Sequence, residues 1–244
     1  MNNNKMSYLK FMKILNFDKK IRLGAEKDGG YVIADLDEEN PYDCYISAGV
    51  SNEESFSRDF IKKYNMTKYN SYAFDGTIEH YPHKYTDDIT FIKKNISYIK
   101  DNKNADLSWL TNNFNNIFLK MDIEGSEYLW LLSQSNEKMN KFKQIIIEFH
   151  GLTGNDYNVK LPLKLLCLEK FLNTHFMIHV HANNFGSVKN GVPDVIEVTY
   201  LNKNYFSDKY IFELNKVPLP IDGLDFPNNP KKDDISLNYF PFVN

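Results

Sequence analysis

The sequence contains very little cysteine. Only two of its 244 residues are cysteine, Cys44 and Cys167, and both lie in apolar stretches. They are too far apart to form the short-spaced pair that a zinc site requires. Two thiols also cannot build the disulfide framework of a small secreted domain. We therefore predict that both cysteines are buried and free, as is usual in a reducing compartment.

Long apolar runs and an excess of one charge are also missing. No stretch approaches the roughly 18 apolar residues of a membrane-spanning helix, and the start of the chain lacks a signal-peptide profile. With 29 basic and 32 acidic residues, the net charge is −3. This balance excludes the general basic field of a nucleic-acid-binding protein. We expect a cytoplasmic protein without a membrane span or a nucleic-acid partner, and the sequence leaves its oligomeric state open.

The pattern that is present is an alternation of strands and helices. It predicts an α/β fold with a mostly parallel, doubly wound sheet flanked by helices. The expected strands are residues 31–34, 44–50, 71–76, 90–96, 117–122, 144–149, 176–181, 195–201 and 210–214. The expected helices are 53–61, 106–110, 127–132 and 161–173. Residues 1–244 are interpreted as one domain: a leading helix within 1–20, whose apolar spacing spans 6–17, a core of 21–214, and an extended, proline-rich tail of 215–244.

The turn after the strand at 44–50 lacks a phosphate-binding fingerprint. Ser47-Ala48-Gly49 has neither the three glycines of a dinucleotide fold nor the Gly-Lys-Ser/Thr of a P-loop. Asp75 lies 26 residues after Gly49 (75 − 49), near the spacing of about 20 at which an acid binds ribose hydroxyls. A carboxylate can accept hydrogen bonds from both hydroxyls. The combination favours S-adenosylmethionine over NAD or ATP, while Asp75-Gly76 as a simple turn is the alternative.

The most informative stretch runs from Lys120 to Glu127. It follows an apolar strand and presents Asp122 and Glu124 before a glycine turn and a helix. The strand at 144–149 ends similarly, with Glu148 and His150. Because the carboxyl ends of parallel strands meet at one edge of the sheet, where ligands bind, these groups predict an active-site rim.

Six stretches resemble the motifs of FkbM-type methyltransferases, in the same order. They are Asp28 to Val32, Tyr45 to Val50, Lys120 to Glu127, Ile147 to Gly151, His179 to Asn184 and Pro193 to Tyr200. The resemblance covers about residues 20 to 201. It implies a Rossmann-like class I fold and O-methyl transfer from S-adenosylmethionine, often to sugars. One position departs from the family: Ser57 follows Ser55-Phe56, where the family often has an acid.

The resemblance and the residue chemistry together suggest roles for individual groups. The predicted cofactor-binding residues are Asp28, Gly30, Ser47, Gly49, Asp75 and Gly76. Methyl transfer to a hydroxyl requires an in-line oxygen and a group that takes its proton. Asp122 is the first candidate and His150 the second, because the unperturbed pKa of histidine suits proton transfer near neutrality. A carboxylate that only caps the following helix is an equally good interpretation of Asp122.

Two further groups are candidates for the site. Asp122, Glu148 and His150 come from neighbouring strand ends and could bind Mg²⁺ or Mn²⁺. His179 and His181 alternate along one strand, so both should lie on the same, solvent-accessible face. His181 is therefore a third catalytic candidate, and a pair of structural histidines is the alternative.

The sequence thus predicts an S-adenosylmethionine-dependent O-methyltransferase. The expected acceptor is a sugar hydroxyl of a glycan or of a nucleotide- or lipid-linked saccharide, as in polysaccharide biosynthesis. Two alternatives remain open. The same acidic rim could belong to a metal-dependent nucleotide-sugar or hydrolytic enzyme, or the chain could be a binding protein that kept the fold without catalysis.

Overall fold

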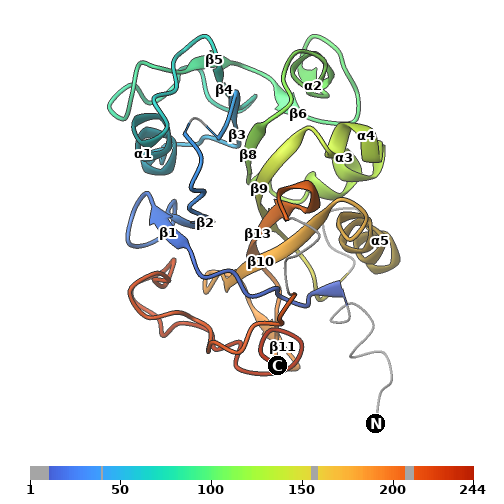
Figure 1. The fold of residues 1–244 in the computed structure, drawn as a ribbon. Helices are drawn as coiled ribbons and strands as arrows, with labels where there is room; N and C mark the ends of the chain where they lie inside the picture. Colours follow the sequence, from blue (N-terminus) through green and yellow to red (C-terminus); the bar gives the residue numbers. More distant parts are fainter. Residues whose placement is uncertain (1–10, 40, 155–158, 207–211) are drawn as a thin grey trace.

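The computed structural model describes residues 11–39, 41–154, 159–206 and 212–244. Its centre is a seven-stranded sheet in the order β10-β13-β9-β8-β3-β4-β5 (Figure 1). The strands are β3 (Cys44–Ala48), β4 (Ser71–Phe74), β5 (Thr90–Ile92), β8 (Ile117–Met121), β9 (Phe142–Phe149), β10 (His175–Ala182) and β13 (Ile196–Asn202). The α/β class is as predicted.

The sheet is mixed. The pairs β5–β4, β4–β3, β3–β8 and β8–β9 are parallel, whereas β13 runs antiparallel to both β9 and β10. The predicted mostly parallel, doubly wound sheet is therefore not confirmed. The reason lies in residues 183–195, which join β10 to β13. They hold only the small ladder of β11 (Val188–Lys189) and β12 (Val192–Pro193), and a parallel connection would usually need a crossover helix.

The two faces of the sheet are covered differently. One face packs against the helices α2 (Ser108–Asn113), α3 (Glu127–Ser133), α4 (Asn136–Met139) and α5 (Leu161–Phe171). The other packs against α1 (Ser55–Lys63) and the antiparallel strands β1 (Lys20–Leu23) and β2 (Tyr31–Ala34). Successive strand residues alternate between these cores, because side chains of a strand point to opposite faces: Leu119 belongs to the helical core and Phe118 to the other.

Two expectations near the ends of the sheet need correction. The single strand predicted at 90–96 is divided into β5 and β6 (Asn95–Ile96), and β6 pairs with β7 (Asn104–Ala105) outside the main sheet. Of the strand predicted at 210–214, residues 210 and 211 lie outside the described part of the chain, Phe212 and Glu213 are not in a strand, and Leu214 forms one isolated bridge with Leu15. The short 3-10 helix η3 (Lys203–Tyr205) follows β13.

The leading helix expected over 6–17 is not formed from residue 12 to residue 17, and residues 1–10 lie outside the described part of the chain. Instead, the backbone N–H of Leu15 donates to Met177 O (2.8 Å), and that of Asn16 donates to Glu213 O (2.7 Å). Met12 and Ile14 are buried nonetheless. Partners distant in sequence satisfy these backbone groups, so burial of the apolar residues does not require a helix.

The tail after residue 214 packs on the sheet without regular structure. Its side chains Leu219, Leu237 and Phe242 are buried in the core on the helical side. Figure 1 draws the tail in orange to red on the β10 side of the molecule. Both cysteines are buried and free, as predicted. Among the residues described, no helix is long and apolar enough to cross a membrane.

Candidate active site

A cavity of about 370 Å³ lies at the carboxyl ends of β3, β4 and β8. Four of the predicted site residues line it: Asp28, Gly49, Asp75 and Asp122. The other lining residues are Gly29, Tyr31, Val50, Ser51, Asn52, Glu53, Glu54, Phe56, Phe74, Thr77, Asn95, Ile96, Lys120, Ile123, Glu124 and Ser126. The edge at which the sequence placed an active-site rim is thus hollow.

Gly49 brings the turn after β3 into contact with the end of β8. Its φ is +82°, and a Cβ atom at this position would lie 1.6 Å from the carbonyl oxygen of Asp122. The N–H of Gly49 donates to Phe74 O (2.9 Å), which ties the same turn to β4. Only glycine permits both the conformation and the close approach. Gly49 therefore allows the turn after β3 to contact the end of β8.

Two residues without this freedom also adopt left-handed backbone at the cavity. Ser51 has a φ of 48° and Glu124 a φ of 53°, and both line the wall. Such conformations cost free energy in residues that carry a Cβ, and they persist where the surrounding structure imposes them. Strained backbone at both sides of one cavity is typical of a functional site.

Asp75 holds the turn after β3. Its Oδ2 accepts hydrogen bonds from the N–H groups of Val50 (3.0 Å) and Ser51 (2.9 Å). Its Oδ1 accepts from the N–H (2.7 Å) and the hydroxyl (2.6 Å) of Thr77. Burial raises its pKa, but these hydrogen bonds outweigh burial and lower it below the ordinary value. A ribose would therefore have to share this carboxylate with Thr77, and the ribose contact stays a prediction.

Of three further residues predicted to bind the cofactor, Asp28 lines the cavity, whereas Gly30 and Gly76 lie outside its lining. Asp28 is on the wall, and its Oδ1 accepts from Asn228 Nδ2 (3.3 Å). Gly30 does not line the cavity, because it forms a tight turn in which a Cβ would lie 1.9 Å from Ala25 O. Gly76 packs against the side chain of Asn95 and is also outside the lining. These glycines shape the loops that carry the wall.

The buried carboxylate of Glu54 is a site residue that the sequence did not indicate. It accepts hydrogen bonds from the hydroxyls of Ser47 (2.9 Å), Ser57 and Tyr81 (3.2 Å). The ammonium of Lys120 lies 4.0 Å away. Burial raises the pKa of Glu54, while Lys120 and the hydroxyls oppose that shift. Ser47, predicted to contact the cofactor, is fully buried behind the wall and supports Glu54 instead.

The available signal for Glu54 was the departure at Ser57. The sequence placed Glu53 and Glu54 in the first turn of a helix, but α1 begins at Ser55, and Glu54 occupies the preceding position with its side chain turned inward. Its hydrogen bond with Ser57 puts a carboxylate beside the position where the family often has an acid. The predicted helix includes Glu54 in its first turn, whereas α1 begins one residue after it. The two differ only in the helix boundary, which is a poorly defined feature.

His150 lies among four carboxylates. Its Nδ1 is 3.1 Å from Glu127 Oε1, and its Nε2 is 3.3 Å from Glu148, 3.4 Å from Glu124 and 3.8 Å from Asp122. Burial lowers the pKa of this imidazole, but Glu127 and Glu148 outweigh burial and raise it to about 11. These contacts favour the protonated imidazole, in which His150 is a counter-ion of the surrounding carboxylates, and its role as a proton acceptor stays a prediction.

The carboxylates around His150 differ in what else they bind. Burial raises the pKa of Asp122 to about 6, against the opposing charges of Lys120 and His150, and its Oδ1 has no hydrogen-bond partner among the described residues. Burial and the nearby Asp122 raise the pKa of Glu148 to about 8. The Oε1 of Glu148 also accepts from Asn183 Nδ2 (2.9 Å). Asp122 thus lines the cavity and keeps one buried oxygen, 3.8 Å from His150 Nε2, without a hydrogen bond among the described residues.

The geometry changes the set of residues that could hold a metal ion. Asp122, Glu127 and His150 offer ligand atoms that all lie within 4.8 Å of one another. Glu148, part of the predicted set, is not in this group and bonds Asn183 instead. Glu127 is fully buried and its Oε1 accepts from the N–H groups of Ile123 and Gly125, while its Oε2 has no hydrogen-bond partner within the described part of the chain. Two orphaned carboxylate oxygens fit either a cation or a hydroxyl donor.

The comparison with protein families agrees with this geometry. The methyltransferase FkbM domain matches residues 7–182. This range contains every wall residue of the cavity and the cluster around His150. The chain belongs to the FkbM methyltransferase family. No curated protein sequence matches it.

In this FkbM methyltransferase, the histidines His179 and His181 of β10 are buried. The prediction that they lie on a solvent-accessible face was wrong. His181 lies between Glu197 (3.1 Å from Nδ1) and Asp234 (3.0 Å from Nε2), and His179 Nε2 lies 2.8 Å from Asp225. Both histidines are buried, because the C-terminal tail covers this face of the sheet. His181 is outside the cavity lining. The interpretation as a pair of structural histidines fits these contacts.

The ion pairs of His181 predict a pH-dependent stability. Burial lowers its pKa, but Asp234 and Glu197 outweigh burial and raise it from 6.5 to about 10. The stabilisation is fully present below the unfolded pKa and is lost as the pH rises through the folded one. Between these values, the free energy of unfolding of the wild type should fall by up to about 1.4 kcal/mol per pH unit relative to His181→Gln. Urea unfolding across this range tests the prediction, and parallel pH profiles of the two proteins would contradict it.

Proposed function

We propose that this FkbM methyltransferase transfers the methyl group of S-adenosylmethionine to a hydroxyl of a saccharide. The observation that carries the proposal is the cavity at the carboxyl ends of the parallel strands, which Gly49, Asp75 and Asp122 line. This is the edge at which open α/β sheets bind their ligands. The strand order supports a class I methyltransferase fold for the chain.

The residues of the chain can supply the binding and the proton transfer. Gly49 allows the cofactor to approach the end of β3 closely, and the carboxyl groups of the wall suit its positive sulfonium centre. The carboxylate of Asp122, which lines the cavity, is the group that would accept the hydrogen bond and then the proton of the acceptor hydroxyl. The imidazolium of His150 stabilises the charge of Asp122 from 3.8 Å. Ser47 holds Glu54 in the wall behind the cofactor.

A divalent cation is the alternative way to activate the hydroxyl. The residues that would hold it are Asp122, Glu127 and His150, with Glu127 in the place predicted for Glu148. When bound, Mg²⁺ or Mn²⁺ would lower the pKa of the hydroxyl. His150 would then have to give up one proton, and it could not also be the imidazolium that stabilises Asp122, so the two arrangements exclude each other.

Calorimetric titration with S-adenosylmethionine and S-adenosylhomocysteine tests the proposal. We expect both ligands to bind with micromolar dissociation constants, because the cavity is already formed in the protein without an acceptor. Assays of methyl transfer after treatment with EDTA, and then with added Mg²⁺, separate the two arrangements. Unchanged methyl transfer in EDTA would assign the proton transfer to Asp122, and loss restored by Mg²⁺ would assign it to the cation. Failure of both ligands to bind would overturn the methyltransferase proposal.

A further inference from the structure

One wall of the cavity is a loop that contacts the C-terminal tail. Residues 24–30 join β1 to β2, and Asp28 and Gly29 of this loop line the cavity. The backbone N–H of Asp28 donates to the carbonyl oxygen of Asn228 (3.2 Å), and Asn228 Nδ2 donates to Asp28 Oδ1 (3.3 Å). The match to the FkbM domain ends at residue 182, so these contacts come from a part of the chain that the match does not include.

Arg22 connects the same loop to the tail at a second place. Its guanidinium donates from Nε to Ala25 O (2.9 Å) and from Nη2 to Lys27 O (2.9 Å), and both carbonyls belong to the loop. Its Nη1 donates to Leu224 O (3.2 Å) in the tail, and its Cζ lies 5.2 Å from the centre of the Phe226 ring. Figure 1 accordingly draws the tail, in orange to red, beside β1. A planar guanidinium can bond several carbonyls at fixed angles, so Arg22 holds the loop against the tail.

Asn228 is itself fixed by the sheet. It is only 2% exposed, and its Nδ2 also donates to Glu197 Oε1 (2.6 Å) on β13. Glu197 in turn lies 3.1 Å from His181 Nδ1, so the amide is bound to a buried pair of opposite charge. One side chain thereby links the sheet to the carboxylate of Asp28. Asn228 does not line the cavity, and any effect that it has on a ligand passes through Asp28.

Among the acidic residues of the wall, Asp28 is suited to bind a cation. Three of the others already accept several hydrogen bonds: Glu54 from three hydroxyls, Asp75 from Thr77 and two turn N–H groups, and Glu53 from a hydroxyl and an N–H group. Burial raises the pKa of Asp28, and the hydrogen bond from Asn228 opposes that shift only in part. A positive group beside Asp28 would therefore stabilise its charged form.

We propose that Asn228 is a positioning residue: it holds Asp28 where this carboxylate binds the ammonium group in the methionine part of S-adenosylmethionine. The inference rests on the proposed function and assigns the tail a part in cofactor binding. The ribose is expected at Asp75, so the methionine part is left for another section of the wall. A carboxylate on a loop binds more tightly when it is already held in place, because ordering the loop then costs no binding free energy.

Two ligands that differ in the amino-acid part test the inference by calorimetric titration. S-adenosylhomocysteine carries the ammonium group, whereas 5′-methylthioadenosine ends in a methyl group instead. Failure of S-adenosylhomocysteine to bind the wild type would contradict the proposed function itself. If it binds, Asn228→Ala should weaken its binding about fivefold and leave that of 5′-methylthioadenosine within about twofold of the wild type. Equal weakening of both ligands, or no weakening of either, would overturn the inference.

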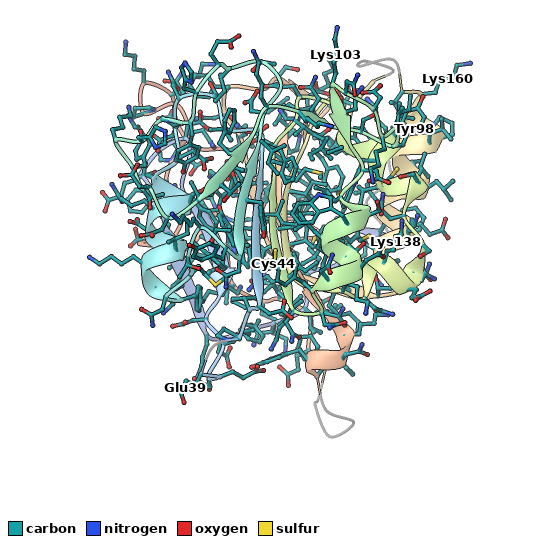
Figure 2. All side chains as sticks on the ribbon, turned by 90° about the horizontal axis from the view of Figure 1, so that it is seen from above. Glu39, Cys44, Tyr98, Lys103, Lys138 and Lys160 are labelled. Carbon is teal, nitrogen blue, oxygen red and sulfur yellow. The ribbon has the colours of Figure 1, made fainter. Side chains whose placement is uncertain are left out.

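A double-mutant cycle shows whether Asn228 acts through Asp28. Asp28→Asn should weaken the binding of S-adenosylhomocysteine about tenfold, and adding Asn228→Ala to it should change the affinity by less than about twofold. Additive losses would contradict a positioning role. Glu39→Gln, which should leave the affinity unchanged, controls for the change in net charge. Figure 2 labels Glu39 on the side opposite to Lys103, whose carbonyl accepts from the cavity residue Asn95.

Asn215 is the matched control for the loss of a buried amide in the tail. It is 1% exposed, and its Nδ2 donates to Val217 O (2.8 Å) and Phe242 O (3.0 Å), both within the tail. Asn215→Ala should lower the free energy of unfolding in urea and leave the affinity for S-adenosylhomocysteine unchanged. If it weakens binding as much as Asn228→Ala does, general loosening of the tail explains both results and the inference fails.

Arg22→Lys provides a second test that decides the matter if Asn228→Ala does not fold. The substitution keeps the positive charge but cannot bond three carbonyls in the fixed geometry of the guanidinium. We expect it to weaken the binding of S-adenosylhomocysteine about two- to fivefold, with 5′-methylthioadenosine unaffected. Unchanged affinity for S-adenosylhomocysteine in this variant would show that the tail does not position the loop for the cofactor.

Discussion

Replacing Asp122 by asparagine should abolish methyl transfer while S-adenosylhomocysteine still binds. The substitution keeps the size of the side chain but removes its ability to take a proton, and a positioned general base contributes about 10²- to 10⁴-fold to a rate. The contacts that shape the cofactor side do not depend on the carboxylate, because they run through the backbone: Asp122 N–H donates to Ala48 O (2.9 Å). We therefore expect a loss of about a thousandfold in kcat.

The measurement is the transfer of labelled methyl to the proposed saccharide acceptor, with calorimetric titration of S-adenosylhomocysteine on the same preparation. Glu124→Gln is the matched control, because Glu124 also lies near His150 but is largely exposed. Its kcat should stay within about tenfold of the wild type, since a solvated carboxylate contributes little. If Asp122→Asn keeps wild-type turnover, Asp122 is not the proton acceptor. Such a result would leave the cofactor site intact and direct attention to Glu148.

Replacing His150 by alanine should destabilise the fold by about 3 to 5 kcal/mol. The imidazolium faces Glu127 and Glu148, which are almost completely buried. Without it, these carboxylates retain their desolvation penalty and lose the opposite charge that compensates for it. Urea unfolding of the variant and the wild type at about pH 9, above the pKa of Glu148 (about 8) and below that of His150 (about 11), measures the difference. The exposed pair His83–Asp87, 2.8 Å apart, provides the control: His83→Ala should change the free energy of unfolding by less than about 1 kcal/mol.

A second variant separates charge from packing at the same place. The double substitution His150→Gln with Glu148→Gln removes the imidazolium together with one of its buried carboxylates. If uncompensated charge is the cause, the double variant should be more stable than His150→Ala, because one fewer buried charge lacks a partner. Equal losses of stability would show that the volume of the imidazole, rather than its charge, carries the effect.

The strand-end motifs were sufficient to predict that three residues at the ends of parallel strands lie at one edge of the sheet. Gly49, Asp75 and Asp122 each follow a core strand by one residue, and the carboxyl ends of parallel neighbours meet at one edge. The structure accordingly places all three at a single cavity. Short-range sequence patterns suffice here because the strand, its turn and the next helix are contiguous in the chain.

The orientation of the acidic side chains could not be predicted in the same way. Glu148 and Glu127 both lie near His150, but Glu148 also bonds Asn183, whereas Glu127 joins the group with metal-ligand geometry. Asn183 is 35 residues further along the chain. Which of two neighbouring carboxylates points toward a third group depends on such distant partners, and sequence spacing does not record them.

The sequence by itself determined the family, the α/β class, the buried free cysteines and the edge of the sheet where the cavity lies, because each depends on local patterns of apolar, turn and acidic residues. Only the tertiary structure decided that β13 is antiparallel, that residues 12–17 are not helical, that Glu54 supports the cavity wall, and that the tail covers His179 and His181. Each of these outcomes depends on contacts between segments far apart in the chain. The free energy of these contacts comes from burial and hydrogen bonding between two segments, so the sequence of one segment alone does not predict them.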